Sequence, residues 1–266
     1  MSLAIFKADF RRYWKLLLVF TVVLLFYFVV MMSMFNPTNA ASVEEMMKLM
    51  PQGMLDAFGM GNLSSSFTGS LANYFYGMIV FLFPTICFII IANGIVAHYV
   101  DSGAIANFLS TPLTRTRFVV TQAIFLLISL TLMFGILVGV GIASCEALYP
   151  GELDLNAFLL MNLSSYITYL CITGISFCAS CLFNDTGKSL LFGAGLPILF
   201  MLMKMMGQAN DKVGWMADIS PYSLYSPTEI AQSGQLELLP TVVLVAVALV
   251  TYLLGITVFR KKNLPV

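Results

Sequence analysis

A short polar segment between two long apolar runs decides how the rest of the chain is interpreted. Residues 101–117 read DSGAIANFLSTPLTRTR. Ser102 can cap a helix start, because its hydroxyl can accept backbone N–H bonds that the first turn leaves open. Ile105, Phe108 and Leu109 then fall on one face of that helix. The pattern predicts a compact amphipathic loop whose apolar edge suits docking onto another protein.

The second half of this segment ends the predicted helix and leads into the next apolar run. Pro112 has no amide hydrogen to donate and disfavours a helical residue before it. Arg115 and Arg117 follow at the mouth of the next run. We therefore expect residues 98–117 to form a loop that joins two membrane helices.

Composition excludes a soluble globular protein. Of the 266 residues, 59% are hydrophobic and only 10% are charged, whereas soluble domains are about half apolar and about a quarter charged. Membrane helices need about 20 apolar residues each, so the length suits about six of them. We predict an all-α polytopic membrane protein with a single transmembrane domain over residues 1–266.

The apolar runs give the expected spans. A basic amphipathic helix at residues 2–15 is expected to lie as an elbow in the membrane interface. Pro84 predicts a kink within the second span, and Gly135-x-x-x-Gly139 predicts a close helix contact in the third. The six spans are expected at residues 16–35, 71–97, 118–144, 157–182, 189–206 and 238–259.

Charge segregation sets the orientation. If both termini and the loops at 98–117 and 183–188 are cytoplasmic, that side holds ten of the thirteen basic residues and three of the thirteen acidic ones. The ten basic residues are Lys7, Arg11, Arg12, Lys15, Arg115, Arg117, Lys188, Arg260, Lys261 and Lys262. The excess of positive charge on cytoplasmic loops favours this orientation.

The residues that could carry chemistry do not form a catalytic or metal site. His98 is the one histidine, and Cys178-x-x-Cys181 has no second pair. Gly187-Lys188-Ser189 lacks the first glycine of a phosphate-binding loop, because Leu182 stands there. We therefore predict no catalytic residue, no metal and no nucleic-acid partner.

The segment 101–115 resembles the first cytoplasmic loop of type-2 ABC transporter permeases. The matching residues are Asp101, Gly103, Ile105, Leu109, Ser110, Pro112, Thr114 and Arg115. The resemblance implies that this loop is a coupling helix that contacts a separate ATPase subunit. The contact residues expected from it are Asp101, Ser102, Gly103, Ile105, Phe108, Leu109, Pro112, Arg115 and Arg117.

The same resemblance implies further parts of the assembly. A smaller second contact with the ATPase is expected at Asn184, Asp185 and Lys188. The partner subunit would bind ATP and Mg, with no cofactor in this chain. A second permease chain, identical or homologous, would complete the transporter in the bacterial cell membrane.

The cargo is expected to be hydrophobic or amphipathic. Small permeases of this kind resemble exporters of toxin and antimicrobial peptides, and peptides are the expected cargo; ions or small drugs are the alternative. A secondary transporter or channel that works alone is another reading, as is an intramembrane enzyme. Asn73, Tyr76 and Asn93 are candidate pathway-lining residues, because polar groups at membrane depth face the bundle or a cavity. Hydrogen bonds between helices are the alternative role for each.

Overall fold

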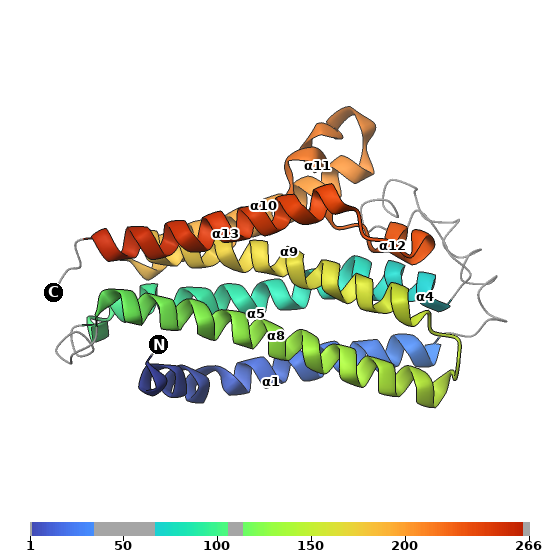
Figure 1. Cartoon of the computed structure of the whole chain (residues 1–266). Coiled ribbons are helices and arrows are strands. Elements are labelled where there is room, and N and C mark those ends of the chain that lie inside the picture. The colour runs from blue at the N-terminus through green and yellow to red at the C-terminus, as the bar shows by residue number, and fades with distance from the viewer. Residues whose placement is uncertain (1, 35–66, 106–113, 263–266) are drawn as a thin grey trace.

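The protein is a bundle of long helices. The computed structural model describes residues 2–34, 67–105 and 114–262. Figure 1 shows the long helices lying side by side along one direction, and α1 begins at the same end of the bundle at which α13 ends. Within the described residues there are helices and no strands.

Six helical segments among the described residues are long and apolar enough to cross a membrane, which confirms the predicted all-α polytopic fold. Five of them are single helices, and the second is built from four consecutive pieces. The single helices are α1 (Leu3–Met34), α8 (Arg115–Leu148), α9 (Leu155–Leu182), α10 (Thr186–Ala209) and α13 (Leu238–Lys261). The pieces of the second are α4 (Phe67–Ser70), η1 (Leu71–Ile79), α5 (Val80–Ile95) and α6 (Ala97–Asp101).

The first helix is continuous across the boundary expected between elbow and span. The sequence predicted an interfacial helix over residues 2–15 and a separate span over 16–35, but α1 runs without interruption from Leu3 to Met34. The reason is local, because this stretch contains neither proline nor glycine to end a helix. Its charged residues lie in the first half of one continuous helix.

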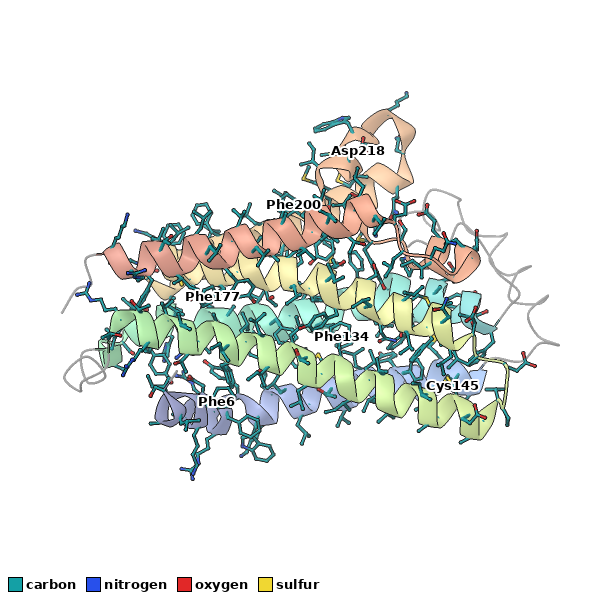
Figure 2. All side chains as sticks on the ribbon, in the orientation of Figure 1. Phe6, Phe134, Cys145, Phe177, Phe200 and Asp218 are labelled. Atoms are coloured by element: carbon teal, nitrogen blue, oxygen red, sulfur yellow. The ribbon has the colours of Figure 1, made fainter. Side chains whose placement is uncertain are left out.

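α9 lies at the centre of the bundle. It packs against α5, α8, α10 and α13. Phe134 on α8 and Phe177 on α9 lie inside the bundle in Figure 2, and both side chains are buried. By contrast, Asp218 lies on α11 (Trp215–Ile219), which projects from the side of the bundle next to α10.

The second span departs from α-helical geometry just before the kink expected at Pro84. η1 is a π-helix, in which each amide bonds five residues back. Accordingly, the Val80 amide donates to the Phe75 carbonyl. When α5 returns to four-residue spacing, one carbonyl is left without an amide partner. Pro84 removes a second amide, the one that would have bonded the Val80 carbonyl.

The hydroxyls of two buried tyrosines donate hydrogen bonds to these carbonyls. The Tyr169 hydroxyl of α9 donates to the Val80 carbonyl at 2.5 Å and also lies 2.8 Å from the Phe81 carbonyl. The Tyr225 hydroxyl donates to the Tyr76 carbonyl at 3.3 Å. Burial raises the pKa of the Tyr225 phenol, so it remains a donor at neutral pH. The irregular turn is thus stabilised by hydrogen bonds from outside its own helix.

A segment of short helices connects α10 to α13. It contains η2 (Asp211–Val213), α11, η3 (Pro221–Leu224) and α12 (Pro227–Ser233). The Lys204 ammonium of α10 donates to the carbonyls of Tyr222 and Tyr225 at 2.9 and 3.2 Å. It also lies 4.5 Å from the centre of the Phe81 ring. This ammonium therefore fastens η3 to the spans.

Glycines mark close helix contacts. The predicted Gly135–Gly139 contact has no neighbour within the described part of this chain, which leaves a neighbour in a second chain as the other reading of this pattern. A Cβ added at Gly135 or Gly139 would meet nothing within 4 Å, so this pair contacts no other described helix of the chain. Gly141 is the glycine of α8 that packs, because a Cβ there would lie 2.7 Å from the Phe158 ring. A spacing of four residues does not say which face of a helix has a neighbour.

Candidate functional site

The candidate site is the base of the predicted coupling loop. We define the loop base as residues 97–105 and 114–117, together with the helix ends that contact them. α5 ends at Ile95, and Val96 interrupts the helix with φ −126° and ψ −66°. The Ala97 amide that follows donates to the Ser180 hydroxyl at 2.9 Å. α6 is therefore a separate five-residue helix that carries the chain into the loop.

Ser102 lies between α6 and the helical residues Ala104 and Ile105, and the residues that follow these two lie outside the described part of the chain. Ser102 follows the last residue of α6, and its hydroxyl donates to the His98 carbonyl at 2.7 Å. Gly103 has φ +71°, in the left-handed region that glycine favours, and its amide donates to the Val100 carbonyl at 3.1 Å. Ser102 and Gly103 thus end one helix, and the match at Gly103 has a conformational cause.

The apolar face predicted for docking is only partly described. Ile105 is 1% exposed and packs into the chain's own core, so in this structure its side chain is not part of an exposed face. Phe108, Leu109 and Pro112 lie outside the described residues. Asp101 and Ser102 are exposed beside the buried Ile105.

The far side of the loop base is fastened to the end of the last span. Thr114 caps the start of α8 by accepting the Arg117 amide at 3.3 Å. The Arg115 guanidinium donates to the Lys262 carbonyl at 2.9 Å, and Arg117 is exposed. Burial lowers the pKa of the Lys262 amine to about 8, and this amine donates to the Cys181 carbonyl at 3.1 Å. The ends of α8, α9 and α13 are therefore joined here.

The second predicted cytoplasmic loop meets the first. Asp185 caps α10 by accepting the Lys188 amide at 2.9 Å. The Thr186 amide donates to the Asp101 carboxylate at 3.3 Å, which joins the two loops. Lys188 is exposed and Asn184 is half-buried. The sequence placed these two loops on one side of the membrane, and in the structure they are in contact.

One residue of this region was missed by the sequence reasoning, which counted Asp9 only as a charge. Asp9 is 0% exposed, and the Tyr99 hydroxyl donates to its carboxylate at 2.8 Å. No local pattern signals this bond, because the partners are 90 residues apart. The loop base is thus tied to α1 as well as to α10 and α13.

The three candidate pathway residues occupy different environments. Tyr76 is 0% exposed, and its hydroxyl accepts from the Asn162 amide at 2.7 Å. Asn73 is also buried, and Asn93 is half-buried near the loop base. The Tyr76–Asn162 bond is a contact between helices.

The described residues contain no group of three or more His, Cys, Asp or Glu side chains that could hold a metal ion. Cys87, Cys145, Cys171 and Cys181 are buried free thiols, and Cys178 is half-buried. The polar bonds of the loop base hold backbone and side chains in place, and they do not assemble a nucleophile with a base. What the geometry provides is a mechanical connection between a loop and several spans.

These features define an all-α polytopic membrane protein. Residues 9–260 match the family model described as the C-terminal domain of the multidrug efflux system permease Rv1217c. Because the match covers nearly the whole chain, the protein belongs to this family of efflux permeases. No curated protein sequence matches the chain.

Proposed function

We propose that the protein is the transmembrane subunit of an ATP-driven ABC exporter of the type-2 class. It forms the translocation pathway in the bacterial cell membrane, with both termini in the cytoplasm. A separate ATPase subunit binds ATP and Mg and supplies the energy. A second permease chain, identical or homologous, completes the pathway.

The observation that supports this proposal most is the construction of the loop base. Three polar bonds attach it to three different spans. Tyr99 donates to Asp9 of α1, Asp101 accepts from Thr186 at the start of α10, and Arg115 donates to Lys262 directly after α13. A subunit that receives movement from outside needs such a distribution, because movement reaches a distant site only through contiguous packed or hydrogen-bonded elements. A loop that merely connected two spans would not need three attachments.

The cargo we propose is an amphipathic or hydrophobic peptide. The bundle interior places hydroxyl and amide groups among apolar side chains, as at Tyr76, Asn162 and Tyr225. Such groups suit cargo with both apolar side chains and hydrogen-bonding backbone. A small apolar drug is the second candidate, favoured by the name of the matching family, which describes a multidrug efflux system.

The proposal is tested by co-expressing the chain with the ATPase encoded beside it and purifying the permease. We expect the two to co-purify with vanadate-sensitive ATPase activity. In proteoliposomes, a fluorescent amphipathic peptide and ethidium serve as the two cargo probes. Peptide-stimulated activity supports the first cargo, and stimulation by ethidium alone replaces it with the second.

A variant at the predicted docking face separates assembly from insertion. Phe108→Asp is expected to abolish co-purification while the permease still inserts, because a charge on an apolar contact is costly to desolvate. Lys188→Gln, at an exposed position of the second loop, is the milder comparison. Transport without any ATPase would replace the proposal with a secondary transporter or channel.

A further inference from the structure

Asp9 is a buried acidic residue on the first span. It lies in the first quarter of α1, and its side chain is 0% exposed. A carboxylate removed from water is costly unless it is compensated, and in membrane proteins such residues usually have a function. A leucine at this position would pack without that cost.

The carboxylate accepts one hydrogen bond, from Tyr99, and lies near a group of α8 and a group of its own helix. The Tyr99 hydroxyl of α6 donates to Asp9 Oδ1 at 2.8 Å. Gln122 of α8 flanks the same carboxyl group, and Arg12 lies one turn along α1. The Arg12 guanidinium also lies 5.6 Å from the centre of the Tyr99 ring. Tyr99 is thus contacted twice by α1, once by an acceptor and once by a cation.

Tyr99 lies where the loop base meets the membrane spans. Tyr99 is the middle residue of α6, the short helix that Val96 separates from α5. It lies two residues before Asp101, which is attached to the second loop. Its ring also packs against Phe118 of α8, with ring centres 6.0 Å apart. A displacement of the loop base therefore reaches α1 first through Tyr99.

α1 has a second attachment to the start of α8. The Ser2 amide donates to the Thr121 hydroxyl at 2.8 Å. This bond joins α1 to the far side of the loop, whereas the Asp9–Tyr99 bond joins it to the near side. The two attachments would move α1 together with the loop rather than with α9.

We propose that Asp9 and Tyr99 are a positioning pair that transmits movement of the coupling loop to α1. The inference rests on the proposed function, because it assumes that an ATPase moves the loop. The pair touches neither nucleotide nor cargo; it acts by keeping α1 and α6 together while other spans change position.

The test measures distances in the purified permease–ATPase complex in nanodiscs, with spin labels on a cysteine-free background. Labels replace Leu18 on α1, Ser102 at the loop base and Leu163 on α9, all three exposed. The distances from position 163 to positions 18 and 102 are measured without nucleotide and after trapping with ATP and vanadate. In the otherwise unchanged protein, both distances are expected to change on trapping.

The variants separate the hydrogen bond from the charge. Tyr99→Phe removes the donor, and Asp9→Leu removes the acceptor. In each variant, the ratio of moved to unmoved populations at position 18 after trapping is expected to fall about threefold or more, the factor by which a typical membrane hydrogen bond shifts an equilibrium. The change at position 102 should persist. Asp9→Asn keeps an acceptor oxygen and is expected to retain most of the movement. Tyr27→Phe, whose ring packs on Phe83 elsewhere along α1, is the matched control and should retain all of it.

The outcomes distinguish the two proposals. If Tyr99→Phe and Asp9→Leu leave the change at position 18 intact, the positioning pair is overturned while the exporter assignment stands. If the unchanged permease binds no ATPase, or if nucleotide moves neither distance, the exporter assignment itself fails. A loss in Asp9→Asn equal to that in Asp9→Leu would contradict the role of the hydrogen bond.

Discussion

The hydroxyl of Tyr169 is expected to contribute measurably to stability because of a proline on another helix. Pro84 cannot donate to the Val80 carbonyl, and the Tyr169 hydroxyl does so at 2.5 Å. The Phe81 carbonyl, also within reach of Tyr169, has a second donor in the Thr85 hydroxyl at 2.7 Å. Tyr169→Phe therefore leaves one buried acceptor unpaired, not two.

The expected loss of stability follows from this single unpaired acceptor. An unpaired buried acceptor costs about 1–3 kcal/mol, and measured hydrogen bonds between membrane helices reach about 1.7 kcal/mol. We expect Tyr169→Phe to lower the free energy of unfolding by about 1–2 kcal/mol. The assay is reversible unfolding in mixed micelles titrated with dodecyl sulfate, and Tyr27→Phe is the control that removes a hydroxyl elsewhere.

A double-mutant cycle tests whether the unpaired Val80 carbonyl is the cause of the expected destabilisation. Pro84→Ala supplies an amide that can donate to the Val80 carbonyl, so the carbonyl no longer depends on Tyr169. In that background, Tyr169→Phe should cost less than about half of what it costs in the original protein. Equal costs in the two backgrounds would refute the explanation, because the tyrosine would then act by some route other than the carbonyl.

Four further variants test other contacts. Gly207→Ala should lower the free energy of unfolding, since a Cβ at Gly207 would lie 2.6 Å from the backbone nitrogen of Ala217; Gly195→Ala on the same helix meets nothing within 4 Å and should be neutral or stabilising by up to about 1 kcal/mol. Lys204→Met should speed amide hydrogen exchange in η3 and α12, because it removes the donor that holds the η3 carbonyls; unchanged exchange would show that packing alone holds this segment. Arg115→Met should speed exchange at the last turn of α13 about threefold or more while sparing its middle, and uniform protection along α13 would count against the attachment.

The spans were predictable because their signal is local and long. Each apolar run exceeds what a soluble core helix needs, and the expected second to sixth spans lie within the observed helices. The observed helices extend beyond several expected boundaries to residues that cap them. Thr114, Asp154 and Asp185 accept amides at the starts of α8, α9 and α10, and capping preferences could have located them.

The loop base could be located in the sequence, but not its attachments. Charge segregation and the 101–117 pattern predict that it lies on the same side of the membrane as the second loop, and the Asp101–Thr186 bond brings the two together. The bonds from Arg115 to Lys262 and from Tyr99 to Asp9 join residues 147 and 90 positions apart, and periodicity is silent at that range. The π-helix also escaped prediction, since its stabilising hydroxyls come from other segments, although Pro84 marked where the irregularity lies.

The central claim is that the loop base faces the cytoplasm, where an ATPase can reach it. The most direct measurement is labelling of single cysteines in intact cells with a thiol reagent that cannot cross the membrane, using Ser102→Cys and Glu152→Cys in a cysteine-free background; both positions are exposed. We expect the cysteine at position 152 to react in intact cells and the cysteine at position 102 to react only after the cells are broken. Reaction at position 102 in intact cells, with protection at position 152, would invert the topology and contradict the account.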